Sequence, residues 1–272
     1  RLGWTVDLIP VSANGIVDTD QLPVDLISKD SLVSVMMVNN ETGVIQPVAE
    51  LASLVKSKGG WMHTDAVQAL SKIPCNFADS GVDAMSLSAH KINGPKGVGA
   101  LIVDKKLPLN AFIKGGGHEF GLRSGTENVA SIVGFGVAAE LAVSNLSNYG
   151  PHLSVLRDEI EAKLIRIGAV IHGLAAPRLS NTSYFSIPGI QGETLVMELN
   201  KVGFSVASGA ACSSHGSGSS ATLRAMKVPE ELAHGAVRLS LGMDNGEKEC
   251  DEFSAALALI VSRLKKLVSL TV

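Results

Sequence analysis

The sequence has few cysteines and few aromatic residues. Its three cysteines, Cys75, Cys212 and Cys250, show neither a paired pattern nor a metal-ligand spacing, which argues against a disulfide framework and favours a reducing compartment. Only 4% of the residues are aromatic, whereas 46% are hydrophobic. We therefore expect a core of aliphatic side chains, as in α/β proteins.

Strong charge and long apolar runs are also absent. The formal net charge of -3 argues against binding to nucleic acid or another polyanion. The apolar runs at 33–38 and 255–261 are far shorter than the ~20 residues that cross a bilayer, and segment 1–10 is typical of a strand rather than a signal peptide. We expect a soluble, cytoplasmic chain without membrane contact. An organellar address such as the mitochondrion stays open, because the chain opens at Arg1 rather than at a methionine.

A lysine stands between two apolar segments. Segments 82–88 and 97–103 each predict a buried strand, and the turn between them carries Lys91, followed closely by glycine and proline. Ligands of α/β proteins bind at strand ends, and a desolvated lysine there loses its proton more readily and attacks aldehydes. The placement favours a lysine that binds pyridoxal phosphate, against the alternative of a solvated turn lysine.

A carboxylate precedes this lysine at the end of another predicted strand. Segment 61–68 begins as an apolar strand and runs into Asp65. Pyridoxal phosphate needs a carboxylate at its ring nitrogen as well as a lysine at its aldehyde, and one strand-helix-strand unit can supply both. The alternative for Asp65 alone is an N-cap of the segment that follows.

Six stretches, taken in order, carry a family resemblance. They are Val38–Val44 (VNNETGV), His63–Gln68 (HTDAVQ), Ser88–Lys91 (SAHK), Gly115–Asn128 (GGGHEFGLRSGTEN), Ser208–Cys212 (SGAAC) and Val237–Gly242 (VRLSLG). With them the chain resembles the cysteine desulfurase family, fold-type-I pyridoxal phosphate enzymes of the class-V aminotransferase group that are related to selenocysteine lyase. The TEN triplet at 126–128 resembles the nitrogenase-associated, NifS-like branch. Six ordered blocks are far more specific than any single motif.

The resemblance implies that seven residues bind the cofactor: Asn40, Asp65, Gln68, Ser88, His90, Lys91 and Thr126. In the family pattern, Lys91 holds pyridoxal phosphate, Asp65 pairs with its ring nitrogen and Gln68 bonds its phenolic oxygen. Ser88 and His90 face the phosphate. The family also has an earlier part of the large domain that is missing here, with a phosphate-binding turn and a histidine that stacks on the ring.

Thr126 and Asn40, together with Arg238, also have implied roles in assembly and substrate binding. Thr126 resembles a residue that reaches the phosphate of a neighbouring subunit, which implies a homodimer. Asn40 and Arg238 resemble the groups that orient the substrate L-cysteine. The Arg238 guanidinium would bind the substrate carboxylate through two parallel hydrogen bonds. Taken alone, Asn40 reads as a turn residue, His90 as a histidine beside a turn and Arg238 as a surface arginine on a strand.

Cys212 is a second chemical centre. It closes an apolar strand and opens a segment of serines and glycines with one histidine, His215, a composition that cannot bury apolar area and is typical of a mobile loop. A thiolate in such a loop can carry sulfur from a deep site to a partner. His215 is interpreted as a solvated loop histidine. Cys75 and Cys250 are interpreted as structural.

The order of predicted elements indicates an α/β fold. Strands alternate with helices up to about residue 145, including a helix that starts at Pro47 and ends at Gly59 and Gly60, which is typical of a mostly parallel sheet flanked by helices. Small polar residues, glycine and proline at 144–151 then break the pattern. We expect a large cofactor-binding domain at 1–146 and a smaller α+β domain at 147–272. A long helix from Pro151 should open the second domain.

We therefore expect a desulfurase that converts L-cysteine to L-alanine and captures the sulfur as a persulfide on Cys212. The sulfur would pass to an iron-sulfur scaffold or a thiolation acceptor. Three alternatives stay open: a selenocysteine lyase, an aminotransferase, and a non-catalytic remnant that only binds partners.

Overall fold

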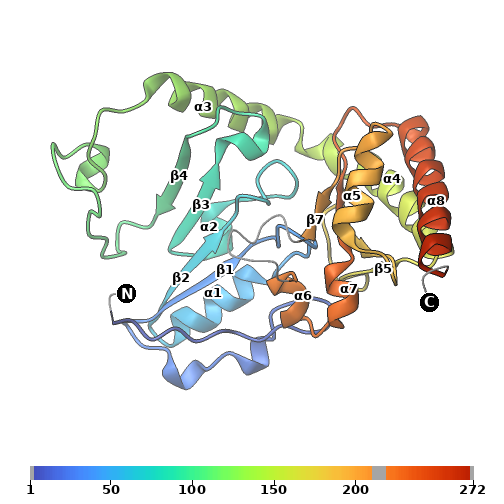
Figure 1. Ribbon diagram of the computed structural model, residues 1–272. Coiled ribbons are helices and arrows are strands. Elements are labelled where there is room, and N and C mark those ends of the chain that lie inside the picture. Colours follow the sequence, from blue (N-terminus) through green and yellow to red (C-terminus); the bar gives the residue numbers. More distant parts are fainter. Residues whose placement is uncertain (1–2, 210–218, 270–272) are drawn as a thin grey trace. The chain divides into compact units, whose positions relative to one another are not determined.

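The computed structural model describes residues 3–209 and 219–269, and its contacts group the chain into two compact units (Figure 1). Unit 1 comprises Arg1–Leu22, Val38–Gln46 and Asn148–Val272, and unit 2 comprises Pro23–Met37 and Pro47–Ser147. The longest segment of unit 1 thus begins next to the predicted division at 146/147, while two short early segments also belong to it. The division into two domains at that point stays a prediction.

Unit 2 is built on a four-stranded sheet in the order β1-β2-β3-β4. Its strands are β1 (Leu32–Met36), β2 (Trp61–Asp65), β3 (Ala84–Ser88) and β4 (Gly99–Val103), and its helices are α1 (Val48–Ser57), α2 (Phe77–Ser80) and α3 (Val129–Ser144). The first three strands are parallel, and β4 runs antiparallel to β3. The mostly parallel sheet and the predicted strands at 82–88 and 97–103 are confirmed, but the burial predicted for 97–103 is wrong. The strand β4 is largely exposed, because it is an edge strand of this sheet with only β3 beside it among the described residues.

One face of this sheet contributes to the core of unit 2. Val35, Thr64 and Met85 lie in register on one face and are buried. The helix α1, which packs on β2, contributes its own buried side chains, including Leu51. The predicted glycine stop is confirmed: α1 ends at Ser57, and a Cβ on Gly60 would lie 2.6 Å from the Ile27 side chain.

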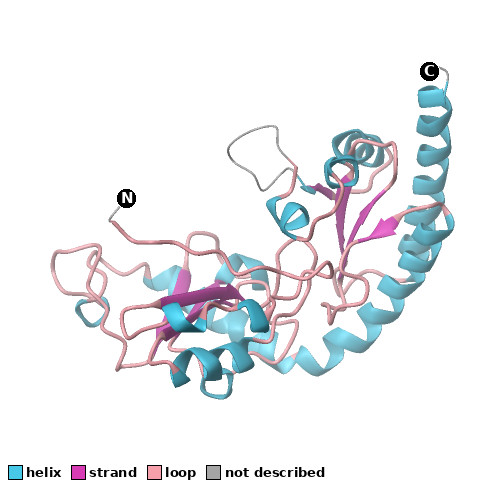
Figure 2. Ribbon diagram, turned by 90° about the horizontal axis from the view of Figure 1, so that it is seen from below, coloured by secondary structure: helices cyan, strands magenta, loops and turns pink. Residues whose placement is uncertain are grey.

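Unit 1 contains an antiparallel sheet in the order β5-β6-β8-β7. The strands are β5 (Val170–Ile171), β6 (Thr182–Ser186), β7 (Ala207–Ser208) and β8 (Ala236–Ser240). The helices are α4 (Leu146–Arg166), α5 (Gly192–Lys201), α6 (Ala221–Ala225), α7 (Glu230–His234) and α8 (Glu247–Ser269). Figure 2 shows helices beside the strands of both units, and aliphatic residues of α4, α5, α8 and the sheet form one core.

The predicted strand at 1–10 is wrong. Residues 3–10 form no strand, and the described part of this segment contributes only an isolated bridge, Val11 to Val17, just beyond it. Trp4, Val6 and Leu8 are largely exposed. Alternating apolar residues suggested a strand, but a strand also needs a neighbour to accept its backbone hydrogen bonds.

The predicted break at 144–151 is also wrong in detail. The helix α3 ends at Ser144, and α4 already begins at Leu146, so Pro151 lies inside a helix rather than at its start. Pro151 is the sixth residue of α4 and lacks a backbone N–H donor, but the residues on both sides of it are helical.

No single helix among the described residues is long and apolar enough to cross a membrane, and α3 with α4 satisfies the length and composition criteria only as a broken pair.

Candidate active site

Asp65 and Ser88 end two neighbouring parallel strands. Asp65 is the last residue of β2, its register partner on β3 is Ser86, and Ser88 closes β3 on the same face. The carboxyl ends of parallel strands are where α/β proteins bind ligands. One Asp65 oxygen accepts a hydrogen bond from the Val67 backbone N–H at 2.9 Å. Asp65 can therefore cap the turn that follows β2 and still present its second carboxylate oxygen to a ligand.

A histidine lies beneath Asp65 on this face and was missed by the sequence analysis as a functional residue. His63 Nδ1 is 2.8 Å from the Ser34 hydroxyl and Nε2 is 2.9 Å from the Ser86 hydroxyl, so the ring links β1, β2 and β3. Burial lowers the pKa of His63, and the nearby Asp65 carboxylate opposes this shift. The sequence did contain one signal for this position: His63 and Asp65 are two residues apart on one strand, so their side chains lie on the same face of the sheet.

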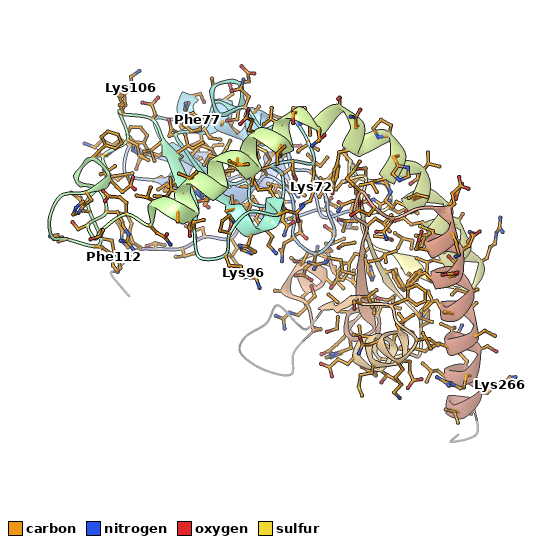
Figure 3. All side chains as sticks on the ribbon, turned by 90° about the horizontal axis from the view of Figure 1, so that it is seen from above. Lys72, Phe77, Lys96, Lys106, Phe112 and Lys266 are labelled. Atoms are coloured by element: carbon orange, nitrogen blue, oxygen red, sulfur yellow. The ribbon has the colours of Figure 1, made fainter. Side chains whose placement is uncertain are left out.

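Gln68 lies in the turn after β2 and contacts a lysine. The Lys72 ammonium is 3.1 Å from both the backbone oxygen and the side-chain oxygen of Gln68 (Lys72 is labelled in Figure 3). Gln68 is half-buried, as is Asp65. The structure therefore places Gln68 one turn beyond Asp65 with its amide oriented by Lys72, a neighbour that the sequence analysis did not single out.

The segment after β3 carries His90 and Lys91 on a short 3-10 helix, η3 (Ala89–Ile92). The Ser88 hydroxyl and His90 Nδ1 are 2.8 Å apart. Ile92 is buried and packs in one cluster with Ala138 of α3, which fixes η3 on the unit. The structure therefore brings Ser88 and His90 together and places Lys91 next to them.

Lys91 is exposed. The sequence analysis expected a desolvated lysine at this strand end, and within the described chain the segment after β3 does not bury it. A short 3-10 helix presents consecutive side chains outward in different directions, so the buried Ala89 and Ile92 occupy the inward positions.

Thr126 lies in the long connection between β4 and α3 and is exposed. Two positive φ angles, at Glu119 and Phe120, mark a tight turn in this connection. Phe120 is fully exposed, as is most of Phe112, which is labelled in Figure 3. The connection that contains the predicted phosphate-binding threonine therefore also carries two exposed phenylalanines.

In unit 1, Asn40 and Arg238 are brought together. Arg238 on β8 donates from Nη1 to the Asn40 backbone oxygen at 2.7 Å. Asn39 shapes this turn, because its side-chain oxygen accepts from the backbone N–H groups of Glu41 and Thr42 at 2.9 Å each. Arg238 Nε is buried without a hydrogen-bond partner among the described residues, as expected of a guanidinium built to receive a ligand.

A buried carboxylate next to Asn40 was also missed by the sequence analysis. Glu41 accepts hydrogen bonds from three hydroxyl groups, those of Tyr184, Ser220 and Thr222. Burial raises the pKa of Tyr184, and the neighbouring Glu41 carboxylate raises it further. These partners are more than 140 positions from Glu41 in sequence, and no local pattern signals such a contact.

Cys212 and His215 lie outside the described residues. The other two cysteines are poor nucleophiles: Cys75 is half-buried with its sulfur 3.7 Å from Met85 Sδ, and Cys250 is buried. Desolvation raises the pKa of both thiols. The described residues contain no cluster of three or more metal-ligating side chains.

A family model for class-V aminotransferases matches residues 1–253. The chain belongs to this family. Two curated relatives of this class-V aminotransferase chain are a cysteine desulfurase of Gluconacetobacter diazotrophicus, 41% identical over 97% of the chain and 67% of the relative, and the cysteine desulfurase IscS of Dictyoglomus turgidum, 39% identical over 97% and 68%. The chain therefore spans about two thirds of the length of these relatives.

Solved structures give the same family and fold. A NifS-like protein matches this class-V aminotransferase with a TM-score of 0.86 at 40% identity, covering 96% of the chain and 69% of that protein. A NifS-like protein from Rickettsia africae also gives a TM-score of 0.86, at 32% identity, covering 93% and 69%. The predicted fold-type-I architecture and the cysteine desulfurase resemblance are confirmed.

Membership of this family implies the use of pyridoxal phosphate, and the described residues fit it. Two adjacent strand ends present a half-buried carboxylate at Asp65 and a hydroxyl-imidazole pair at Ser88 and His90, with the exposed Lys91 amine one residue further on. A carboxylate suits a protonated ring nitrogen, an amine suits an aldehyde, and hydroxyl and imidazole donors suit a phosphate.

Proposed function

We propose that this chain is a cysteine desulfurase that uses pyridoxal phosphate to convert L-cysteine to L-alanine. The observation that carries the proposal is the pairing of Asp65 with the Ser88–His90–Lys91 cluster at adjacent parallel strand ends. The high similarity to curated cysteine desulfurases over 97% of the chain supports the same reaction.

Lys91 would hold the cofactor through its amine, and Asp65 would pair with the ring nitrogen. Gln68 would bond the phenolic oxygen, while Ser88 and His90 would donate to the phosphate. When bound, pyridoxal phosphate supplies an electron sink for the bonds at the substrate Cα. The Asp65 carboxylate keeps the ring nitrogen protonated and so strengthens that sink.

Arg238 and Asn40 would orient the substrate. A guanidinium with a buried Nε that lacks a partner in the described chain is suited to the two-point binding of a carboxylate. Nη1 is already held by the Asn40 backbone oxygen, so the Arg238 side chain is oriented before substrate arrives. The Lys91 amine would remove the proton from the substrate Cα.

Cys212 would take the sulfur. Its thiolate attacks the substrate sulfur and forms an S–S bond, while the substrate Cβ–S bond breaks and its electron pair stays on carbon. That carbon takes up the proton of the substrate thiol and becomes the methyl group of alanine, and the Lys91 ammonium returns the proton that it removed from Cα. The products are alanine and a persulfide on Cys212, and no outside oxidant or reductant is needed.

The same proposal includes partners and location. Thr126 would reach the phosphate of a second subunit in a homodimer, and the persulfide would serve an iron-sulfur scaffold or another sulfur acceptor in the cytoplasm. A relative of this chain carries the name NifS and another the name IscS. The free thiols of Cys75 and Cys250 suit a reducing compartment.

The lysine assignment is tested by trapping. Pyridoxal phosphate is added to the purified chain, the linkage is reduced with borohydride, and the modified peptide is mapped. We expect the label on Lys91, and we expect Lys91→Ala to abolish it and to lower alanine formation by at least about 10²-fold, as for loss of a catalytic proton carrier.

Lys96 is the matched control, because it is an exposed lysine five positions further in the same turn region and is labelled in Figure 3. The Lys96→Ala chain should trap the cofactor at Lys91 as wild type does. A label that follows Lys96, or a Lys91→Ala chain that still releases alanine at the wild-type rate, would show that the lysine has been assigned wrongly.

A further inference from the structure

Lys72 follows the turn after β2 and contacts the residue that is proposed to bond the cofactor's phenolic oxygen. Its ammonium is 3.1 Å from the Gln68 backbone oxygen and 3.1 Å from the Gln68 side-chain oxygen, Oε1. Both side chains are half-buried. One ammonium, which carries three donors, therefore holds two oxygens of a residue that lies four positions earlier in the chain.

The backbone beneath this contact is anchored in unit 2. Ala66 and Ala69 are fully buried, and the Ala69 N–H donates to the Ala66 oxygen at 2.9 Å. The Ala66 N–H donates to the Ser86 oxygen of β3 at 3.0 Å, and the Lys72 N–H donates to the Ala69 oxygen at 3.0 Å. Gln68 and Lys72 therefore start from a defined backbone, and their side chains meet without any rearrangement of the turn.

The contact with Oε1 decides which end of the Gln68 amide is available to a ligand. An ammonium can only donate, so it binds the oxygen of an amide and leaves the NH2 group directed elsewhere. Among the residues that the structure describes, Gln68 Nε2 donates to no partner, whereas Oε1 accepts from Lys72. The amide therefore has its acceptor occupied and its donors open.

An open donor suits the phenolic oxygen of pyridoxal phosphate. That oxygen bears negative charge, so it accepts hydrogen bonds and is repelled by an amide oxygen. An amide that rotates freely presents either end to a ligand. By holding Oε1, Lys72 selects the donor end and restricts the side chain before the cofactor binds, so less conformational freedom is lost on binding.

Two simpler roles for Lys72 are available. A lysine that bonds only a backbone oxygen closes a turn, as lysines do at helix ends, but the bond to Oε1 adds nothing to such a cap. Alternatively, the positive charge of Lys72 attracts an anionic cofactor directly. In either role Lys72 would act equally well in a chain that lacks the Gln68 amide.

We propose that Lys72 is a positioning residue that turns the NH2 group of Gln68 toward the phenolic oxygen of pyridoxal phosphate. The benefit to the cofactor rests on the proposed function, whereas the orientation of the Gln68 amide by Lys72 does not. Lys72 need not touch the cofactor or the substrate, because it acts through Gln68.

Four variants of the full chain test this role. Lys72→Met removes the ammonium and keeps most of the stem, and Lys72→Arg keeps a positively charged donor. Gln68→Ala removes the amide, and the double variant, Lys72→Met with Gln68→Ala, removes both groups. Lys106→Met is the matched control, because Lys106 is an exposed lysine of the same unit and is labelled in Figure 3.

The first readout needs no cofactor. The order of the Gln68 side-chain NH2 group is measured by ¹⁵N relaxation, with two other glutamines as internal references. Gln46 is bonded at both ends of its amide, to the Val17 N–H and to the Gly15 oxygen, at 2.8 Å each. Gln191 is exposed. The first reference marks an ordered amide and the second a mobile one.

The Gln68 amide should be close to Gln46 in order in wild type and in Lys106→Met, and close to Gln191 in Lys72→Met, with at least partial recovery in Lys72→Arg. Hydrogen exchange at Ala69 should stay near wild type, because the anchors of the turn are untouched. Equal order of the Gln68 amide in wild type and Lys72→Met would overturn the proposal. Faster exchange at Ala69 in Lys72→Met would show that Lys72 stabilises the turn instead, and would overturn it too.

The second readout is the dissociation constant of pyridoxal phosphate, measured by absorption titration. Lys72→Met should raise it about fivefold, as expected when a hydrogen bond to a charged group is weakened, and Lys72→Arg should restore part of the affinity. In the Gln68→Ala background, Lys72→Met should add no further loss. The same loss with and without Gln68 would overturn the proposal, because Lys72 would then act by its charge alone.

A wild-type chain that binds no pyridoxal phosphate would refute the proposed function and, with it, the benefit of Lys72 to the cofactor. The relaxation readout would still decide whether Lys72 orients the Gln68 amide. The two failures are therefore distinguishable.

Discussion

At the scale of single residues, a buried histidine in unit 1 has a defined hydrogen-bond partner. His172 is 4% exposed, and its Nε2 is 2.7 Å from the Ser186 hydroxyl. Ser186 donates its own proton to the Leu232 backbone oxygen at 2.6 Å. His172 Nε2 must therefore be the donor toward Ser186, which assigns the neutral tautomer with its proton on Nε2.

This neutral histidine predicts a loss of stability in mild acid. Burial lowers the pKa of His172 from 6.5 to about 4, so the unfolded chain binds a proton that the folded chain does not between these two values. Stability therefore falls as the pH is lowered from 6.5 toward 4, by about 3 kcal/mol over the whole window. Urea unfolding of wild type and His172→Gln at pH 7 and pH 4.5 measures it.

The glutamine variant can still donate to Ser186 but cannot titrate, so its loss of stability between the two pH values should be clearly smaller than that of wild type. The same loss in both proteins would show that other groups, and not His172, cause the acid sensitivity.

At the scale of elements, one buried ion pair ties a helix to a connecting segment within unit 1. Arg178 bonds both carboxylate oxygens of Glu161 on α4, at 2.7 and 2.9 Å, and both side chains are 5% exposed. The Arg178 backbone also forms an isolated bridge with Val44. The pair therefore links α4 to the segment that contains Asn40 and Glu41.

Breaking this pair should destabilise unit 1 strongly. Glu161→Gln leaves the Arg178 guanidinium buried without its carboxylate and should cost about 3–5 kcal/mol in the free energy of unfolding. Replacing both partners, as in Glu161→Gln with Arg178→Met, should recover part of that loss. The measurement is urea unfolding followed by circular dichroism.

Glu252→Gln in α8 is the control, because Glu252 forms a largely exposed pair with Lys248 on the same helix. Its effect should be much smaller, since solvent screens an exposed pair. An effect of Glu161→Gln no larger than that of the control would contradict the structural role of the buried pair.

The elements also show what the sequence could predict. Strands β2 and β3 and the glycine end of α1 were predicted, because apolar runs and turn residues are local signals. The strand at 1–10 was wrong, because alternation says nothing about whether a neighbouring strand exists. The start of α4 was wrong, because its early proline was interpreted as a boundary.

In the candidate site, too, the features with a local sequence signal were predicted and the features that depend on distant segments were not. The positions of Asp65 and Ser88 at strand ends were predicted, since they depend on the strands alone. The contacts of Glu41 with Tyr184 and Ser220 depend on pairing between distant segments, and the exposure of Lys91 depends on which side of η3 is buried. Neither has a local signature.

At the scale of the whole molecule, the residues of the proposed reaction are divided between the two units. Asp65, Gln68, Ser88, His90 and Lys91 belong to unit 2, while Asn40 and Arg238 belong to unit 1. Cofactor binding and substrate orientation are thus separable properties of the chain. Arg238→Lys should weaken cysteine binding without preventing the attachment of pyridoxal phosphate to Lys91.

The most direct test of the desulfurase account is the mass of the Cys212 peptide. The purified chain, loaded with pyridoxal phosphate, is mixed with L-cysteine, and its thiols are blocked and mapped by mass spectrometry while free alanine is counted. The account predicts that the Cys212 peptide gains the mass of one sulfur atom, with one alanine formed per persulfide and no gain at Cys75 or Cys250. Alanine released by a Cys212→Ser chain with sulfide yield unchanged, or no sulfur on Cys212 in a cofactor-loaded wild-type chain, would contradict it.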